Sequence, residues 1–302
     1  MLSKTLAVVG PTASGKSDLA IQIALELESA EVINADAMQL YRGMDIGTAK
    51  LSQADQKGVR HHLIDVADID QEVTAVQYRQ MANAVVQDLT IRGVTPIFAG
   101  GSMFYLASTL DVLDFSPTND PVRERLEAEA EAIGAKAMHD RLRSLDPISA
   151  ERIPSQNQRR VIRALEVIEL TGEPYPSSLP QPKYNRPTIQ LGISVDREVL
   201  KERIRARVER MWDEGLLGEM AQLQASGKSF SRTARVAIGY EQAAKQLSGH
   251  LTKSEAIEET ISLTTRYARR QMSWFNRDGR IIWLDSQQNL LEQAMERIRL
   301  SA

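Results

Sequence analysis

Residues 10–17 of the chain read GPTASGKS, which is the complete glycine-rich pattern of a P-loop. In such a loop the backbone N–H groups around Gly15 converge on anionic oxygens, and Lys16 adds a positive charge. The hydroxyl of Ser17 is placed to reach a Mg²⁺ ion that bridges those oxygens. The motif therefore predicts a site for a diphosphate or triphosphate, formed by Gly10, Pro11, Thr12, Ala13, Ser14, Gly15, Lys16 and Ser17.

The sequence around the motif predicts the elements that hold it. An apolar run at residues 6–9 precedes the loop and is typical of a buried strand, and the residues behind it, 18–24, are typical of a helix. Further strands are predicted at 31–35, 93–99, 189–195 and 280–284, and further helices at 73–92 and 197–214. Strands that alternate with helices indicate an α/β fold with a mainly parallel sheet.

Chemically active residues follow three of these predicted strands. The P-loop follows the first, Asp36 follows the second, and Gly100-Gly101-Ser102 follows the third. Ligands of open parallel sheets bind beyond the carboxyl ends of the strands. We therefore expect these three loops to line one crevice.

The composition changes after Leu113, and this change predicts a second domain. Residues 120–172 are rich in helix-forming Glu and Arg and contain no run typical of a strand. A cluster of prolines between 174 and 187 then breaks helix and is typical of a linker. We expect a P-loop α/β core at 1–114 and 187–302, with a helical insertion domain at 115–186.

Charge and composition exclude several kinds of protein. The 302 residues carry a net charge of −3, so overall basicity gives no sign of a nucleic-acid partner, although a local basic face is compatible with it. The absence of cysteine excludes disulfides, thiolate catalysis and cysteine-based zinc sites. No apolar run approaches the length of a membrane span and no signal peptide is recognisable, so we expect a cytoplasmic protein without a membrane partner. We also expect a monomer.

Longer motifs in the chain make the interpretation specific. Beside the P-loop stand DAMQLYRGMDIGTAK (36–50), HHLID (61–65), GGSMFY (100–105), RRVIRALE (159–166), IGY (238–240) and RRQMSWF (269–275). In this order, and over nearly the whole chain, they resemble the bacterial tRNA dimethylallyltransferases, also called tRNA isopentenyltransferases. The resemblance implies a P-loop-type core and an insertion domain that helps to grip the anticodon stem-loop.

The resemblance also implies a reaction and its residues. A dimethylallyl group passes from dimethylallyl diphosphate to N6 of the adenosine on the 3′ side of the tRNA anticodon. Asp36 corresponds to the proposed general base, and Mg²⁺ with the P-loop stabilises the leaving diphosphate. Arg203 and Arg207 correspond to arginines near the diphosphate. The target base must leave its stack to react, so base flipping is expected.

Contacts with tRNA are implied for several segments. These are Asp36, Ala37, Met38, Gln39, Ser102, Arg123, the helix Arg159, Arg160, Val161, Ile162 and Arg163, and the segment with Arg235, Gly239 and Tyr240. The amide of Gln39 suits the reading of a flanking base. For any single arginine, a solvated helix face is the alternative. Ser102 has two interpretations, a catalytic hydroxyl or a helix cap.

The chain departs from the usual family pattern at three places. Ser102 replaces the usual threonine, Leu51 replaces a proline, and 154–157 (PSQN) replace a His-Pro-Asn-Asp run. The last change affects the expected grip on tRNA more than the reaction. The adjacent histidines His61 and His62 lack the partners that a zinc site needs, and the resemblance assigns them a structural role.

Three other functions share parts of the pattern. An adenylate prenyltransferase would have a similar P-loop and Asp36 loop, but it would not need the insertion with its arginine cluster. A P-loop small-molecule kinase would use the same GPTASGKS motif for ATP. A nucleotide-gated RNA-binding module would bind similar ligands without chemistry.

Overall fold

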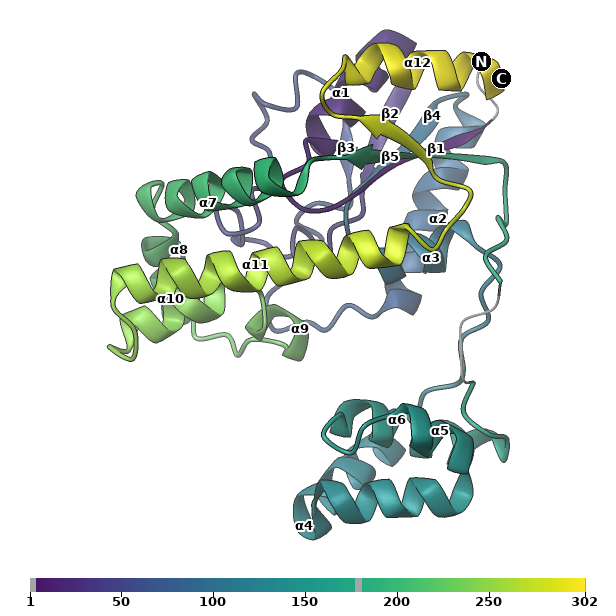
Figure 1. Ribbon diagram of the computed structural model, residues 1–302, viewed down its shortest axis with the longest axis vertical. Coiled ribbons are helices and arrows are strands. Elements are labelled where there is room, and N and C mark those ends of the chain that lie inside the picture. The colour runs from purple at the N-terminus through teal and green to yellow at the C-terminus, as the bar shows by residue number, and fades with distance from the viewer. Residues whose placement is uncertain (1–3, 177–180, 302) are drawn as a thin grey trace. The chain divides into compact units, whose positions relative to one another are not determined.

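The computed structural model describes residues 4–176 and 181–301, and the chain divides into two compact units (Figure 1). The core unit holds the chain up to Asp111 and again from Tyr184, and the insertion unit runs from Val112 to Lys183. These divisions lie close to 114/115 and 186/187, where the change of composition and the prolines predict them. Part of the predicted linker, including Pro180, lies outside the described residues.

A six-stranded sheet with parallel neighbours forms the centre of the core unit. In spatial order its strands are β3 (His61–His62), β2 (Ala30–Asn34), β4 (Thr95–Ala99), β1 (Thr5–Val9), β5 (Thr188–Ser194) and β6 (Ile282–Asp285). Every residue of β1 and β4 is buried, as expected for parallel strands covered on both faces. The predicted α/β fold with a mainly parallel sheet is confirmed.

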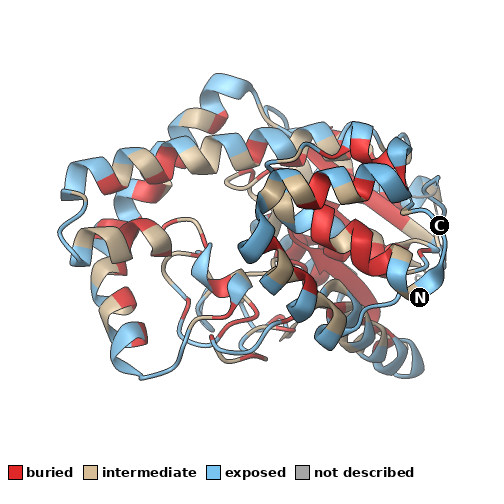
Figure 2. Ribbon diagram, turned by 90° about the horizontal axis from the view of Figure 1, so that it is seen from below, coloured by how far each residue is buried: buried red, intermediate tan, exposed pale blue. Residues whose placement is uncertain are grey.

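Helices cover both faces of the sheet, and alternate residues of β1 show which face each group covers. Leu6 and Val8 belong to one apolar cluster with α1 (Lys16–Leu27) and α12 (Leu290–Ser301). Ala7 and Val9 point to the other face. The buried residues show as red in Figure 2. The remaining helices of the core unit are α2 (Ala75–Ile91), α3 (Met103–Leu110), α7 (Arg197–Asp213), α8 (Leu216–Ala225), α9 (Arg232–Arg235), α10 (Tyr240–Leu247) and α11 (Lys253–Phe275).

The insertion unit is helical and has an apolar cluster of its own. Its helices are α4 (Asp120–Leu145), α5 (Pro147–Arg152) and α6 (Gln158–Thr171). Gly134, with φ of 85°, interrupts the regular backbone of α4. Leu126, Met138, Leu142 and Leu165 are among the buried residues that hold the helices together.

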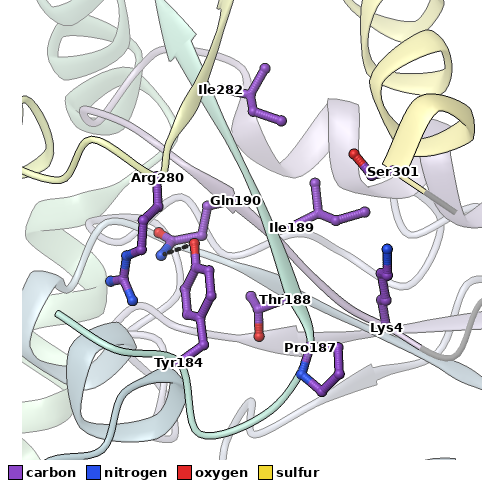
Figure 3. A pocket seen from close by; sticks show the side chains of 9 residues that line it. All are labelled: Lys4, Tyr184, Pro187, Thr188, Ile189, Gln190, Arg280, Ile282 and Ser301. Atoms are coloured by element: carbon purple, nitrogen blue, oxygen red, sulfur yellow. Dashed lines mark hydrogen bonds between the residues drawn. The ribbon is translucent and has the colours of Figure 1, made fainter.

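The chain segments that leave and re-enter the core unit are joined to each other. Asp111 and Tyr184 form an antiparallel bridge, and Arg280 makes an ion pair with Asp111 at 2.6 Å. The Arg280 guanidinium also stacks over the Tyr184 ring, 3.9 Å from its centroid. Both residues line a pocket beside the start of β5 (Figure 3). This pocket contains none of the predicted site residues. The P-loop, Asp36 and Ser102 follow the opposite ends of strands β1, β2 and β4.

Candidate active site

The P-loop connects β1 to α1 and adopts a tightly curved backbone. Gly10 and Gly15 have φ angles of 142° and 91°, and Ala13 also has a positive φ of 62°. Gly15 caps the amino end of α1 without any side-chain hydrogen bond to the cap. The first N–H groups of a helix have no partner within the helix, so they are available to an anion at this point.

Two basic side chains lie at the loop. Lys16 donates a hydrogen bond from Nζ to the carbonyl of Pro11 at 2.5 Å. Burial lowers the pKa of the Lys16 ammonium to about 7; Asp36 opposes this shift, whereas Arg207 adds to it. Arg207 of α7 donates from Nη1 to the Thr12 hydroxyl and from Nη2 to the Thr48 carbonyl, each at 3.1 Å. A bound polyanion would stabilise both charges.

The hydroxyls of the loop complete a site suited to phosphate oxygens. The Oγ of Ser14 is buried and has no hydrogen-bond partner among the described residues. The half-buried Ser17 stands in the first turn of α1. Magnesium usually takes only one or two protein ligands and completes its shell with phosphate oxygens and water. The residues present therefore fit both a diphosphate and a magnesium ion.

The loop after β2 holds Asp36 in a defined orientation. Its N–H donates to the Asn34 side chain at 3.0 Å, and its Oδ1 accepts from the N–H of Met38 at 3.0 Å. The neighbouring loop after β4 is fixed to it, because the Oγ of Ser102 accepts from the N–H of Ala37 at 2.9 Å. Since β2, β4 and β1 are adjacent, the three predicted loops do lie together.

Ser102 also precedes α3 but makes no side-chain cap of it. Its hydroxyl instead bonds to the loop of Asp36, so the capping interpretation is wrong. Gly100 is required here because a Cβ would lie 2.2 Å from the carbonyl oxygen of Ala35.

Helix α11 contributes two residues for which the sequence suggested no role. Gln271 accepts from the N–H of Thr12 at 2.8 Å and donates to the Gly101 carbonyl at 2.9 Å, so its buried amide joins the P-loop to the loop after β4. A Cβ on Gly101 would lie 2.1 Å from the Gln271 Nε2, so a larger residue there would displace this amide from its two hydrogen bonds. Tyr267 lies one turn earlier. Its burial and the charge of Asp36 raise its pKa to about 12, while a hydrogen bond with Ser102 opposes the shift.

The predicted residues of the 36–39 loop and of α7 differ in exposure. Ala37 and Met38 are half-buried, and the Gln39 amide donates to the Thr48 carbonyl at 3.1 Å. Arg203 is exposed one turn before Arg207. Gly239 caps α10 with φ of 94°.

The predicted RNA contacts of α6 fall into two groups. Arg159 and Arg160 are exposed, whereas the side chains of Val161 and Ile162 pack in the apolar cluster of the insertion unit. Arg163 lies on the same helix and is half-buried. The exposed pair is therefore more accessible to a ligand than the other three predicted residues of this helix.

Arg163 and Arg123 share a buried partner. The Glu166 side chain is 0% exposed and accepts from Arg163 at 2.7 Å and from Arg123 at 3.0 Å. Both arginines therefore hold the insertion unit together, in addition to any contact with RNA.

The predicted RNA-binding residues at 235–240 also differ in exposure. Arg235 is exposed, but Tyr240 is 1% exposed and its hydroxyl donates to Glu219 at 2.5 Å.

The histidine pair forms the edge strand β3. The His62 Nε2 contacts Glu31 at 2.6 Å, and the His61 Nδ1 contacts the Val59 carbonyl at 2.9 Å.

Comparison with known proteins identifies the group to which this site belongs. The family model described as IPP transferase matches residues 39–278. The chain is 50% identical to the tRNA dimethylallyltransferase of Kineococcus radiotolerans, over 92% of this chain and 90% of that protein. It is 47% identical to that of Salinispora arenicola, over 98% and 87% of the two chains. The chain belongs to the IPP transferase family.

Solved structures agree with this assignment. The tRNA isopentenylpyrophosphate transferase of Bacillus halodurans is similar with a TM-score of 0.72 and 36% identity, over 99% of this chain and 95% of that one. A eukaryotic dimethylallyltransferase, described as acting on tRNA, is similar with a TM-score of 0.82 and 26% identity, over 99% and 80%. As a family member, the chain is a prenyltransferase enzyme. None of the helices within the described residues has the length and apolar character of a membrane span.

Proposed function

We propose that the chain transfers a dimethylallyl group from dimethylallyl diphosphate to N6 of the adenosine on the 3′ side of the tRNA anticodon. The names of its relatives support tRNA and the prenyl group as the reactants. One arrangement in the core unit supports the chemistry. Arg207 donates to the Thr12 hydroxyl of the P-loop, which also carries Lys16, and the loops with Asp36 and the P-loop follow strands β2 and β1 of the same parallel sheet. The carboxylate of Asp36 and the two basic side chains therefore lie at the same edge of the sheet.

In the proposed step, one bond forms as another breaks, and the proton and the charge are both accounted for. The N6 nitrogen forms a bond to C1 of the dimethylallyl group as the bond from C1 to the diphosphate oxygen breaks. Asp36 accepts the N6 proton, which relieves the positive charge that would otherwise develop on nitrogen. The P-loop N–H groups, Lys16 and Arg207 stabilise the negative charge that grows on the leaving diphosphate.

Other residues prepare the reactants. The Ser17 hydroxyl would hold a magnesium ion, which when bound neutralises part of the diphosphate charge. Ser102 fixes the Asp36 loop beside the amine. The adenosine enters flipped out of its stack, with Gln39 beside a neighbouring base. The exposed Arg159, Arg160 and Arg235 are proposed to contact the RNA backbone. We further propose a monomer acting in the cytoplasm.

Calorimetry tests which phosphate ligand the P-loop prefers. We expect dimethylallyl thiodiphosphate to bind in the presence of Mg²⁺ and tRNA, and a non-hydrolysable ATP analogue to bind more weakly under the same conditions. Markedly tighter binding of the ATP analogue would support a kinase and overturn the prenyltransferase proposal.

A further inference from the structure

The carboxylate of Glu219, on α8, binds the backbone of residues 45–47, a loop that lies more than 170 residues away in the sequence. It accepts hydrogen bonds from three successive backbone N–H groups, those of Asp45 at 3.1 Å, Ile46 at 2.9 Å and Gly47 at 3.5 Å. Successive N–H groups that converge in this way form an anion-binding concavity, and here a protein carboxylate fills it. Glu219 therefore fixes the backbone of the loop directly.

Tyr240, at the start of α10, completes this attachment. Its hydroxyl donates to the Glu219 carboxylate at 2.5 Å and accepts from the N–H of Gly47 at 3.2 Å. Burial and the charge of Glu219 raise the pKa of this hydroxyl, so it stays protonated and continues to donate. A Cβ on Gly47 would lie 2.4 Å from the Tyr240 ring, so only glycine allows the loop to approach so closely.

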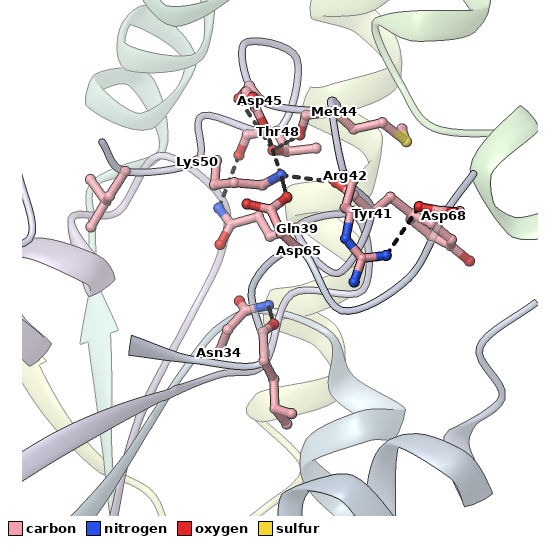
Figure 4. A network of polar contacts seen from close by, with 12 residues as sticks. Asn34, Gln39, Tyr41, Arg42, Met44, Asp45, Thr48, Lys50, Asp65 and Asp68 are labelled. Carbon is pink, nitrogen blue, oxygen red and sulfur yellow. Dashed lines mark hydrogen bonds and ion pairs between the residues drawn. The ribbon is translucent and has the colours of Figure 1, made fainter. Parts of the chain in front are cut away.

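The loop carries this attachment to the phosphate site. Thr48 follows Gly47 immediately, and its carbonyl accepts from Arg207 and from Gln39, each at 3.1 Å. Its hydroxyl donates to the Met44 carbonyl at 2.7 Å, and Lys50 makes an ion pair with Asp45 (Figure 4). The loop is therefore cross-linked internally, and a displacement at residues 45–47 also displaces the Thr48 carbonyl.

We infer that Glu219 and Tyr240 are positioning residues that set the orientation of Arg207 toward the diphosphate through residues 45–48. The inference rests on the proposed function, because it takes Arg207 as a ligand of the diphosphate. It also gives Tyr240 a role that its burial permits, in place of a side-chain contact with tRNA. The Arg207 guanidinium donates to Thr12 and to the Thr48 carbonyl, and Glu219 holds the loop that carries Thr48.

A double-mutant cycle tests this coupling. Glu219→Gln keeps the shape of the side chain but replaces one acceptor oxygen by an NH₂ group that faces backbone N–H donors. We expect it to weaken dimethylallyl thiodiphosphate binding about tenfold, the scale of a lost charge-assisted hydrogen bond. In an Arg207→Gln background the same change should alter binding by less than about twofold, because residues that act through one another are not additive.

Steady-state kinetics separate positioning from a loss of folded protein. A smaller folded fraction lowers kcat alone, whereas the inference predicts a higher KM for dimethylallyl diphosphate and an unchanged KM for tRNA. The matched control is Glu214→Gln, an exposed glutamate just before α8, which should leave both KM values unchanged. If Glu219→Gln does not fold, Tyr240→Phe gives the same test, with an expected weakening of about threefold.

Two outcomes would overturn the inference. One is an equal weakening by Glu219→Gln with and without Arg207, and the other is unchanged binding in a folded Glu219→Gln protein. The Arg207→Gln variant alone tests the premise. If it does not weaken analogue binding, the proposed role of Arg207 fails; if it does and Glu219→Gln does not, only the positioning role fails.

Discussion

At the scale of single residues, the proposed reaction depends most on the carboxylate of Asp36. The carboxylate accepts from the Met38 N–H, and the N–H of Asp36 itself donates to the Asn34 side chain. Asp36→Asn preserves the shape and one acceptor oxygen while removing the basicity. Since general-base assistance contributes about 10²–10⁴-fold, we expect the single-turnover rate to fall by roughly that factor. Binding of tRNA should change little. A variant that turns over at nearly the wild-type rate would show that another group, or none, accepts the proton.

The lowered pKa of Lys16 predicts that the protein takes up a proton when a diphosphate binds. Burial lowers the pKa of Lys16 to about 7 from an ordinary value of 10.5, so between these values the side chain is largely neutral until an anion binds. A diphosphate beside Lys16 raises the pKa again, so binding at about pH 8.5 should take up a proton. Calorimetry in buffers of different ionisation enthalpy measures this uptake. Lys16→Arg should abolish it, because arginine stays protonated. Binding without uptake in the wild type would contradict the assigned charge state.

Three groups of site residues could be predicted from a local pattern alone. The P-loop, Asp36 and Ser102 each follow an apolar strand directly, so the topology of a parallel sheet was enough to bring them together. Gln271 and Glu219 have no such signature. Each acts through a contact with a loop more than a hundred residues away in the sequence, and only the packing of α11 and α8 creates these contacts.

At the scale of elements, Glu166 holds the insertion unit together. Burial alone would raise its pKa, but hydrogen bonds from the Asn119 N–H, Arg163 and Arg123 outweigh this effect and lower the pKa below its ordinary value. The folded-state pKa is thus depressed, so this stabilisation is present above the ordinary carboxyl pKa and is lost as the pH falls through the lowered value.

Replacing Glu166 should therefore destabilise this unit. We expect Glu166→Gln to reduce the free energy of unfolding by about 2–3 kcal/mol near neutral pH, because two partly buried arginines lose their charged partner. The control is Glu169→Gln on the same helix, where an exposed pair with Arg125 contributes less than about 1 kcal/mol. Chemical denaturation of the full chain measures both. Equal effects of the two variants would contradict the structural role of Glu166.

Five of the six strands, and the boundaries of α2 and α7 to within two residues, could be predicted from periodicity and apolar runs. Strand β3 could not, because two histidines give no strand pattern and only pairing with β2 extends them. The helices between residues 216 and 275 were not predicted as elements either. Their short apolar stripes become interpretable only when they pack against α7 and one another.

At the scale of the whole molecule, tRNA binding should depend on exposed positive charge on the core unit and on the insertion unit. Arg159 and Arg160 are the exposed pair of α6, and we expect Arg159→Gln with Arg160→Gln to raise the KM for tRNA. Each lost phosphate contact should reduce the slope of log affinity against log salt by about 0.7–0.9. The single-turnover rate at saturating tRNA should barely change. An unchanged salt slope would exclude phosphate contacts by this pair.

Transfer of a prenyl group to tRNA can be measured directly. Purified enzyme is incubated with Mg²⁺, isotopically labelled dimethylallyl diphosphate and either tRNA or AMP, and ATP hydrolysis is measured in parallel. We expect label on N6 of the adenosine 3′ of the anticodon, equimolar release of diphosphate, and no comparable transfer to AMP. Preferential labelling of AMP, or ATP turnover without transfer to tRNA, would contradict the proposed function.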